Sequence, residues 1–193
     1  LLVAGGMRVK PLVLLSVPVG AVGVWGVYKL SAVRWSRIIS FLDPFRDIQN
    51  TSYQVAQGLY AIGSGGIFGK GLGQSVQKYS YLPEPYNDFI FAIICEELGL
   101  IGAILVIALF VVLILRALRI AMNAPDTYST LVAVGIVAQI AIQTTLNIAV
   151  ATSSVPNTGV SLPFFSYGGS SVMMLLLEMG VLLNISRYSE RRE

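Results

Sequence analysis

Long apolar runs alternate with short polar segments along the chain. They lie at about 11–28, 98–115, 131–151 and 172–185, and a shorter run covers 1–6. With their flanking residues, these runs predict membrane spans at about 11–28, 88–120, 131–151 and 170–187, because roughly 20 helical residues cross a bilayer's hydrocarbon. The pattern therefore predicts an all-α fold, a polytopic transmembrane helical bundle that forms a single membrane domain over residues 1–193.

Composition supports an integral membrane protein. Hydrophobic residues make up 55% of the 193 positions and charged residues 12%, about half of the ~25% that is usual in soluble proteins. The chain starts without Met, and residues 1–6 resemble the tail of a span that began earlier. We therefore expect the C-terminal portion of a larger protein, with four spans and the tail of a preceding one.

Basic residues predict how the spans are oriented. Arg8 and Lys10 precede the first full span, and Arg187, Arg191 and Arg192 follow the last one. The positive-inside rule places both groups in the cytoplasm. The long loop 29–87 and the turn 152–169 are then expected on the outer face.

The long outer loop contains two recognisable segments. Residues 53–62 place apolar side chains at helical spacing, which predicts a short helix that lies on the membrane surface or packs against neighbouring spans. Residues 63–75 are rich in glycine but lack a Gly-Lys-Ser/Thr ending and a preceding strand. They favour a flexible or tightly turned lid over a nucleotide cradle.

Acidic residues gather where a polar loop meets a long apolar run, between Tyr79 and Gly99. Pro85 is suited to the first turn of a helix that continues to Ile120, which would place Asp88 in that turn. Counting back from the inner end puts the outer interface near Glu96 and Glu97, with Asp88 about two turns above the lipid. A carboxylate there would meet the headgroups.

Polar residues also occur inside the last two spans. Gln139, Gln143 and Asn147 form one stripe at intervals of four residues, which is typical of hydrogen bonds between membrane helices or of a polar cavity lining. Glu178 lies in the last span. A buried acid costs about 2.5–3.5 kcal/mol on insertion scales, so Glu178 should face protein or water.

The outer turn at 155–171 combines two prolines with three glycines, so it cannot form a regular helix. Ser166 or Ser170 could cap the final helix, and the backbone N–H groups at its start would favour an anion such as pyrophosphate. A purely structural cap and re-entrant turn is the alternative. Irregular backbone at membrane depth requires burial in protein or a wet cavity.

Composition excludes several classes of function for this portion. Histidine is absent, which rules out a Ser-His-Asp triad and His-ligated metal. The single Cys95 cannot form an intramolecular disulfide and is expected to be a buried, inert thiol. A net charge of +3 without a basic arm argues against nucleic acid as a partner.

Four stretches carry a resemblance to a known family: YLPEPYNDFIFAIICEELG, FGKGLGQSVQKYSYLPEP, NTGVSLPFFSYGGSS and LLNISRY. Over essentially all residues the chain resembles the SEDS proteins (shape, elongation, division and sporulation), and within them the FtsW and SpoVE branch. The resemblance implies the C-terminal part of a fold with ten transmembrane helices. It also implies a peptidoglycan glycosyltransferase of the bacterial cytoplasmic membrane, which polymerises lipid II on the outer face.

The same resemblance implies partners and site residues. The partners are a class B penicillin-binding protein, which is a transpeptidase, and other divisome, elongasome or sporulation proteins. Asp88 matches the family's essential acid, and a divalent cation, Mg or Mn, is implied with Asp88 as a candidate ligand. The residues implied around the substrate are Lys78, Glu84, Glu96, Glu97, Ser166, Tyr167, Gly168, Gly169, Ser170 and Ser171. Thr158 stands where some relatives carry a Lys.

The chemistry leaves several readings of Asp88 open. In the transfer, the 4-hydroxyl of the acceptor sugar attacks the anomeric carbon of the donor while pyrophosphate leaves, and Asp88 could be the general base. A first-turn position beside the positive helix end stabilises the carboxylate, which makes it a weaker base. Orienting the hydroxyl or holding a cation fits as well, and a residue that merely favours the helix start is the structural alternative. A lipid II flippase and a non-catalytic scaffold for the transpeptidase are the alternative functions.

Overall fold

The computed structural model describes residues 14, 17–18, 40–45, 52–80 and 88–189 of the chain. Nearly all of the expected span 11–28, the segment 1–6, Glu84 and much of the loop 29–87 lie outside these residues. Five helices are described in full: α3 (Tyr53–Gly65), α4 (Val76–Ser80), α5 (Ile90–Met122), α6 (Thr127–Ala151) and α7 (Gly169–Ser189). Every regular element in the described part is a helix, which confirms the all-α prediction.

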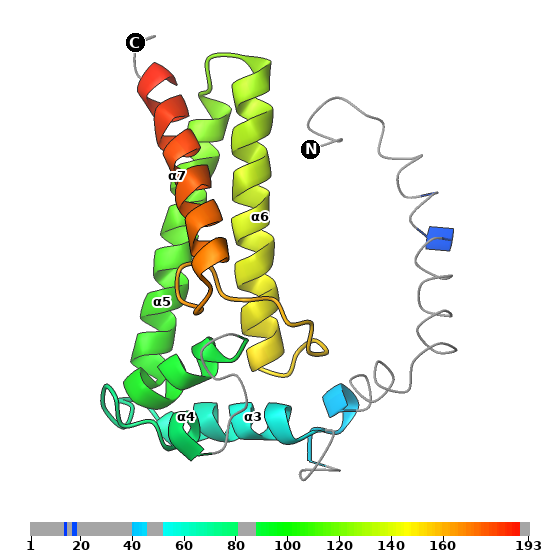
Figure 1. Cartoon of the computed structure of the whole chain (residues 1–193), viewed down its shortest axis with the longest axis vertical. Coiled ribbons are helices and arrows are strands. Elements are labelled where there is room, and N and C mark those ends of the chain that lie inside the picture. The colour runs from blue at the N-terminus through cyan, green and yellow to red at the C-terminus, as the bar shows by residue number, and fades with distance from the viewer. Residues whose placement is uncertain (1–13, 15–16, 19–39, 46–51, 81–87, 190–193) are drawn as a thin grey trace.

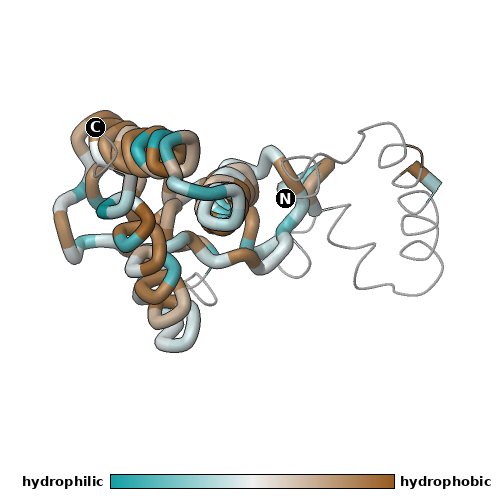
Figure 2. Tube along the Cα trace, turned by 90° about the horizontal axis from the view of Figure 1, so that it is seen from above, coloured by the Kyte–Doolittle hydropathy of each residue, from teal (hydrophilic) through white to brown (hydrophobic). Residues whose placement is uncertain are grey.

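Helices α5, α6 and α7 run side by side as a bundle (Figure 1). Each is long and apolar enough to cross a membrane. Small side chains let the helices approach closely, since Ala117 and Ala121 of α5 and Ala133 of α6 are buried in one cluster with Leu182 and Ile185 of α7. Figure 2, which looks down the bundle, shows many apolar residues in its helices. Many large apolar side chains of α5 are exposed, as lipid contact requires. The protein is a multi-pass membrane protein.

Helices α3 and α4 lie across one end of this bundle (Figure 1). Val55 and Ala61 of α3 pack with Phe89, Ala92 and Val150 in a buried cluster. Of the two alternatives for residues 53–62, the structure therefore shows a helix packed on the spans.

Helix α5 is interrupted at Gly99, where φ is 68° and ψ is −166°. In a continuous helix the amides of Leu100 and Ile101 would bond to the carbonyls of Glu96 and Glu97. Here they donate to the carbonyls of Gly66 and Ile67, at 2.9 and 3.3 Å. The carbonyls of Glu96 and Glu97 accept instead from the amides of Lys70 and Gly71, each at 3.0 Å. Residues 66–71 thus replace the hydrogen bonds that the helix gives up at its break.

Glycine is required on both sides of this contact. A Cβ atom built on Gly69 would lie 2.2 Å from the carbonyl oxygen of Glu97, and both Gly69 and Gly99 have positive φ. Backbone can approach backbone this closely only where side chains are missing. The glycine-rich segment is therefore tightly turned and bonded into α5.

The expected start of the long helix is wrong. Helix α5 begins at Ile90, with Phe89 as its N-cap residue, so Asp88 lies in a turn before the first helical residue. Phe89 is fully buried, and a Cβ on Gly58 of α3 would stand 2.7 Å from the Phe89 ring. Burying this ring against α3 holds Phe89 at φ −111° and ψ 19°, outside helical geometry. The helix also ends two residues later than expected, at Met122.

Candidate functional site

The carboxylate of Glu96 is the centre of a buried polar cluster. Its side chain is 0% exposed, and the Lys70 ammonium lies 2.7 Å from one of its oxygens. Ser75 donates its hydroxyl to the other oxygen, and the amides of Val76 and Gln77 donate at 3.3 and 3.4 Å. These contacts compensate the charge that burial would otherwise make unfavourable.

This cluster explains why α4 begins where it does. The Ser75 hydroxyl accepts a hydrogen bond from the Lys78 amide at 3.0 Å, as an N-cap residue does. The Glu96 carboxylate faces the same helix start, where free N–H groups favour a negative charge. Both oxygens of Glu96 are thus bonded to protein donors, so its geometry supports a role in holding α4 and the glycine segment.

Glu97 and Lys78 form a second, looser pair. The Lys78 ammonium lies 3.8 Å from one Glu97 oxygen, and the two side chains are 21% and 12% exposed. That oxygen of Glu97 has no hydrogen-bond partner within the described part of the chain. Of the residues implied to surround the substrate, Lys78, Glu96 and Glu97 are therefore brought together here, whereas Glu84 lies outside the described residues.

Asp88 faces the outer turn. A Cβ atom built on Gly159 would lie 3.6 Å from a carboxylate oxygen of Asp88. The side-chain amide of Asn147, on α6, donates to the carbonyl oxygen of Asp88 at 3.0 Å and to that of Val160 at 2.8 Å. Two segments that the sequence separates by 70 residues, the Asp88 turn and the outer turn, are thus held side by side.

The outer turn is also tied to α3. The Asn157 side chain accepts the Gly159 amide at 3.1 Å and donates to the Gln54 side chain at 3.2 Å. Gly159 itself has φ +70°, a left-handed conformation that glycine adopts without strain. The half of the turn that Asp88 faces therefore has a defined shape.

The second half of the turn leads into α7. Ser166 is buried, and its hydroxyl accepts the Leu162 amide at 2.8 Å, so it closes the turn in place of the expected helix cap. Ser170 is already the second residue of α7, and the Val172 amide bonds to the Gly168 carbonyl at the helix start. Of the implied substrate residues in this part, Tyr167 is 86% exposed and Gly169, Ser170 and Ser171 are also exposed.

The described residues could hold a divalent cation only in a site that substrate phosphates and water complete. The described residues contain no group of three or more His, Cys, Asp or Glu side chains that could hold a metal ion. Mg²⁺ commonly binds through one or two carboxylates together with waters and substrate phosphates. Asp88, which faces an outer turn, fits such a substrate-bridged site.

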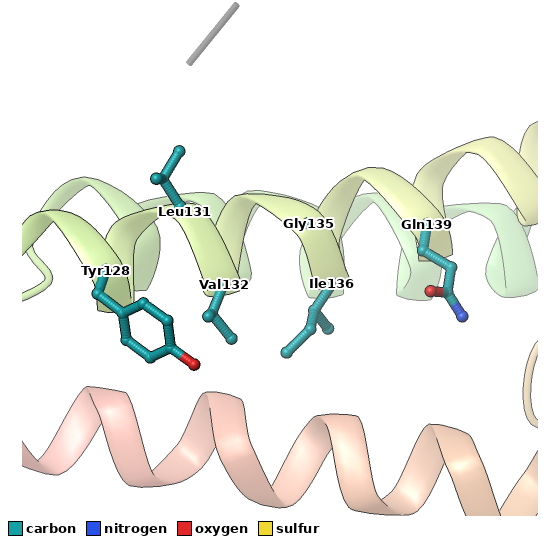
Figure 3. Close-up of a pocket in the computed structure, with 6 residues that line it drawn as sticks. All are labelled: Tyr128, Leu131, Val132, Gly135, Ile136 and Gln139. Atoms are coloured by element: carbon teal, nitrogen blue, oxygen red, sulfur yellow. The ribbon is translucent and has the colours of Figure 1, made fainter. Parts of the chain in front are cut away.

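The polar stripe of α6 divides between two environments. Asn147 is fully buried at the Asp88 end, whereas Gln139 is exposed. Gln139 lines a groove of about 430 Å³ towards the other end of α6. In Figure 3 the side chains of Tyr128, Val132, Ile136 and Gln139 point towards α7. The stripe is therefore not one continuous hydrogen-bonded seam between helices.

Comparison with known proteins decides the family. A family model described as "Cell cycle protein", the FtsW/RodA/SpoVE family, matches residues 1–191. The chain belongs to the FtsW/RodA/SpoVE family.

Curated relatives in this family carry related names. The chain is 52% identical over 184 residues to the stage V sporulation protein E of Bacillus subtilis (strain 168), covering 95% of this chain and 50% of that protein. It is 47% identical over 167 residues to the probable peptidoglycan glycosyltransferase FtsW of the same organism, covering 85% and 41%. For the FtsW of Coxiella burnetii (strain RSA 493 / Nine Mile phase I) the identity is 45% over 194 residues, covering 98% and 52%.

A solved structure agrees with the fold. One chain of a peptidoglycan synthase complex that coordinates polymerization and crosslinking matches with a TM-score of 0.69 and 26% identity. The match covers 92% of this chain and 48% of that one. Against its relatives in the FtsW/RodA/SpoVE family, this chain thus spans about half of their length.

Sequence reasoning missed three residues of the site. The sequence predicts Asn147 only as part of a polar stripe that bonds between helices or lines a cavity, and Gly159 only as one of several turn glycines. The third is Lys70 in the glycine segment, and a cation that precedes the acidic pair Glu96–Glu97 is a usable signal in the sequence. No pattern in the sequence pointed to Asn147 as the contact of Asp88, because 59 residues separate the two.

Proposed function

We propose that this protein is a peptidoglycan glycosyltransferase that polymerises lipid II on the outer face of the bacterial cytoplasmic membrane. Membership of the FtsW/RodA/SpoVE family and relatives named as probable peptidoglycan glycosyltransferases support this function. The observation that carries it is the placement of the Asp88 carboxylate beside Gly159 of the outer turn. Asp88 is the proposed essential acid.

In the proposed reaction, the 4-hydroxyl oxygen of the acceptor sugar forms a bond to the anomeric carbon of the lipid-linked donor. The bond between that carbon and the pyrophosphate oxygen breaks, and lipid pyrophosphate leaves with the electron pair. As a base, Asp88 accepts the hydroxyl proton. Asp88 precedes the first helical residue of α5, and one of its carboxylate oxygens faces Gly159 of the outer turn.

Asp88 is also the residue that would hold Mg²⁺ or Mn²⁺. A bound cation would supply charge neutralisation for the departing pyrophosphate. One carboxylate suffices for such a site when phosphate oxygens and waters complete the coordination. Base and cation ligand are thus the two roles that the experiments on Asp88 must separate.

The other proposed substrate residues fall into two groups. Tyr167, Gly169, Ser170 and Ser171 are exposed at the start of α7, where backbone N–H groups favour an anion. Lys78 supplies a positive charge on α4. Glu96 and Glu97 act through α4. Glu96 holds this helix in place, and Glu97 pairs with its Lys78.

A class B penicillin-binding protein is the proposed partner, and the active site is proposed to face outward. The similar solved chain comes from a complex that couples polymerization to crosslinking. A crosslinking partner acts on newly made glycan, so both reactions belong on the same side of the membrane.

A lipid II flippase is kept as a second candidate because of Glu178. One oxygen of this half-buried carboxylate in α7 has no hydrogen-bond partner within the described residues. Ionisable groups inside membrane helices often belong to transport pathways. A flippase would move lipid II without polymerising it.

The deciding experiment uses the full-length protein with purified lipid II, alone and with its class B partner in a transpeptidase-inactive form. Glycan strands visible by gel electrophoresis are the expected result, and Mg²⁺ or Mn²⁺ should increase their yield. Lipid II that is moved across vesicle membranes but never polymerised would support the flippase. Full transpeptidation in cells without polymerisation by this protein would support a scaffold.

A further inference from the structure

Asn147 uses both hydrogens of its side-chain amide on backbone carbonyls. One hydrogen bond goes to Asp88 at 3.0 Å and the other to Val160 at 2.8 Å. The residue is 0% exposed, so neither bond competes with water. Its own side-chain oxygen has no partner in the described part of the chain. The site therefore uses Asn147 as a double donor.

The two acceptors belong to segments that carry the proposed chemistry. Asp88 precedes α5, and Val160 follows Gly159, which faces the Asp88 carboxylate. On the other side of Asp88 the ring of Phe89 is fully buried against α3. Contacts that hold the peptide bearing Asp88 thus include the Asn147 hydrogen bond and the buried Phe89 ring.

We propose that Asn147 is a positioning residue, which sets the distance between the Asp88 carboxylate and the outer turn at Gly159. The inference rests on the proposed role of Asp88 in glycan polymerisation. Asn147 touches neither the reacting sugar nor the pyrophosphate and acts only through the two backbone segments. Misplacing a catalytic group by about 1 Å can reduce a rate about 10²-fold, which is the size of effect expected here.

The donor pattern predicts which substitutions matter. Asn147→Asp keeps the shape of the side chain but puts one carboxyl oxygen in the place of the NH2 group, so the ionised acid donates neither bond. Asn147→Ser keeps a single donor, which can serve only one of the two segments. Thr144→Val is the matched control, because Thr144 is buried one turn earlier on α6 and its hydroxyl has no hydrogen-bond partner among the described residues.

The first test measures the position itself and needs no activity. Asp88→Cys and Gly159→Cys are combined in a Cys95→Ser background of the full-length protein in membranes, with its partner present. Mild oxidation should form a disulfide between the two positions, detected by mass spectrometry. Asn147→Asp should slow its formation at least tenfold and Asn147→Ser less, whereas Thr144→Val should leave the rate unchanged.

The second test measures polymerisation with Asp88 intact. Asn147→Ser should lower kcat by about 10- to 100-fold with less than a threefold change in KM, since substrate binding is not its task. In an Asp88→Asn background the same substitution should lower the residual rate less than threefold, because Asn147 acts through Asp88. If Asn147 and Asp88 acted independently, the rate reductions caused by the two substitutions would multiply.

The outcomes separate this inference from the proposed function. An unchanged disulfide rate in Asn147→Asp or Asn147→Ser would overturn the positioning role, whatever the activity. If Asp88→Asn polymerises normally while the disulfide rate still depends on Asn147, the proposed function of Asp88 fails and the positioning of the turn stands. Should neither Asn147→Asp nor Asn147→Ser fold, by thermal unfolding in detergent, Asn147 is needed for the fold and the inference is overturned.

Discussion

Gly99 and Gly69 touch backbone to backbone. A Cβ atom on Gly99 would lie 2.3 Å from the Gly69 nitrogen, at the point where α5 breaks and residues 66–71 take over its hydrogen bonds. The break places Glu96 and Glu97 at the end of the first part of α5, beside Lys70 and Lys78. One glycine contact thus organises the polar cluster around α4.

Gly99→Ala should therefore destabilise the protein. The substitution adds left-handed strain to a clash with rigid backbone, and together these cost about 2–5 kcal/mol. Thermal unfolding of the detergent-solubilised protein measures the loss. Gly180→Ala in α7 is the control, because a Cβ there meets nothing within 4 Å and alanine favours a helix. Equal stability of the two variants would contradict the backbone contact.

Lys70→Met should destabilise the fold more than Lys78→Met. Lys70 is the cation at 2.7 Å from the fully buried Glu96, so its removal leaves a buried charge with weaker compensation. Solvent reaches a third of the Lys70 side chain, which reduces the loss to about 1–3 kcal/mol. The looser pair of Lys78 at 3.8 Å should be worth about 1 kcal/mol or less. Denaturation midpoints of both variants measure the two losses of stability. A larger loss for Lys78→Met than for Lys70→Met would reject Glu96 as the centre of the cluster.

The segment that contains α3 and α4 should face the outside of the cell. Ser64 is exposed on α3, so Ser64→Cys in a Cys95→Ser background should react with a membrane-impermeant maleimide in intact cells. Labelling is read on gels before and after permeabilisation. Reaction only in permeabilised cells would place this end of the bundle in the cytoplasm, and the lipid II proposal would fail with it.

Glu178→Gln should leave folding and polymerisation close to wild type. Glutamine keeps the shape and an oxygen acceptor while it removes the charge, and we expect Glu178 to be structural. Polymerisation of lipid II and a thermal unfolding curve are the two measurements. A folded variant without any polymerisation would favour a proton-coupled transporter.

Asp88→Asn should abolish most polymerisation while expression and partner binding stay near normal. Loss of a positioned base reduces a rate by about 10²- to 10⁴-fold, and loss of a metal ligand has a comparable effect. Asparagine retains the size of the side chain, and the Asp88 carbonyl that Asn147 contacts is unchanged. Glycan synthesis from lipid II measures the loss, and near-normal synthesis by a folded variant would reject both roles.

The two roles of Asp88 separate by their response to cations. As a metal ligand, Asp88→Glu should be partly rescued by raised Mg²⁺ or Mn²⁺, because it retains a carboxylate, and Asp88→Asn should not. As a base, neither variant should gain a new cation dependence. A titration of polymerisation against Mn²⁺ for wild type and both variants distinguishes these cases.

Local patterns in the sequence were sufficient for much of this protein. The predicted spans 131–151 and 170–187 fall within α6 and α7, and the helical spacing at 53–62 predicts α3. These features depend on the hydropathy and period of each segment alone, so no knowledge of its neighbours is needed. Extended motifs around Asp88 and the outer turn were likewise sufficient to identify the family.

Only the tertiary structure decided how α5 begins and where it breaks. Its 33 residues look like one apolar helix, yet Phe89 leaves helical geometry where it packs on α3. At the break at Gly99, the residues on either side bond to residues 66–71 and no longer to each other. The partner of Asp88 was hidden for the same reason, since Asn147 lies on another helix. Contacts between distant segments depend on shapes that exist only after the segments have packed. For this protein, sequence determined which of the described segments form long apolar helices, and packing determined which polar groups meet at the end of the bundle.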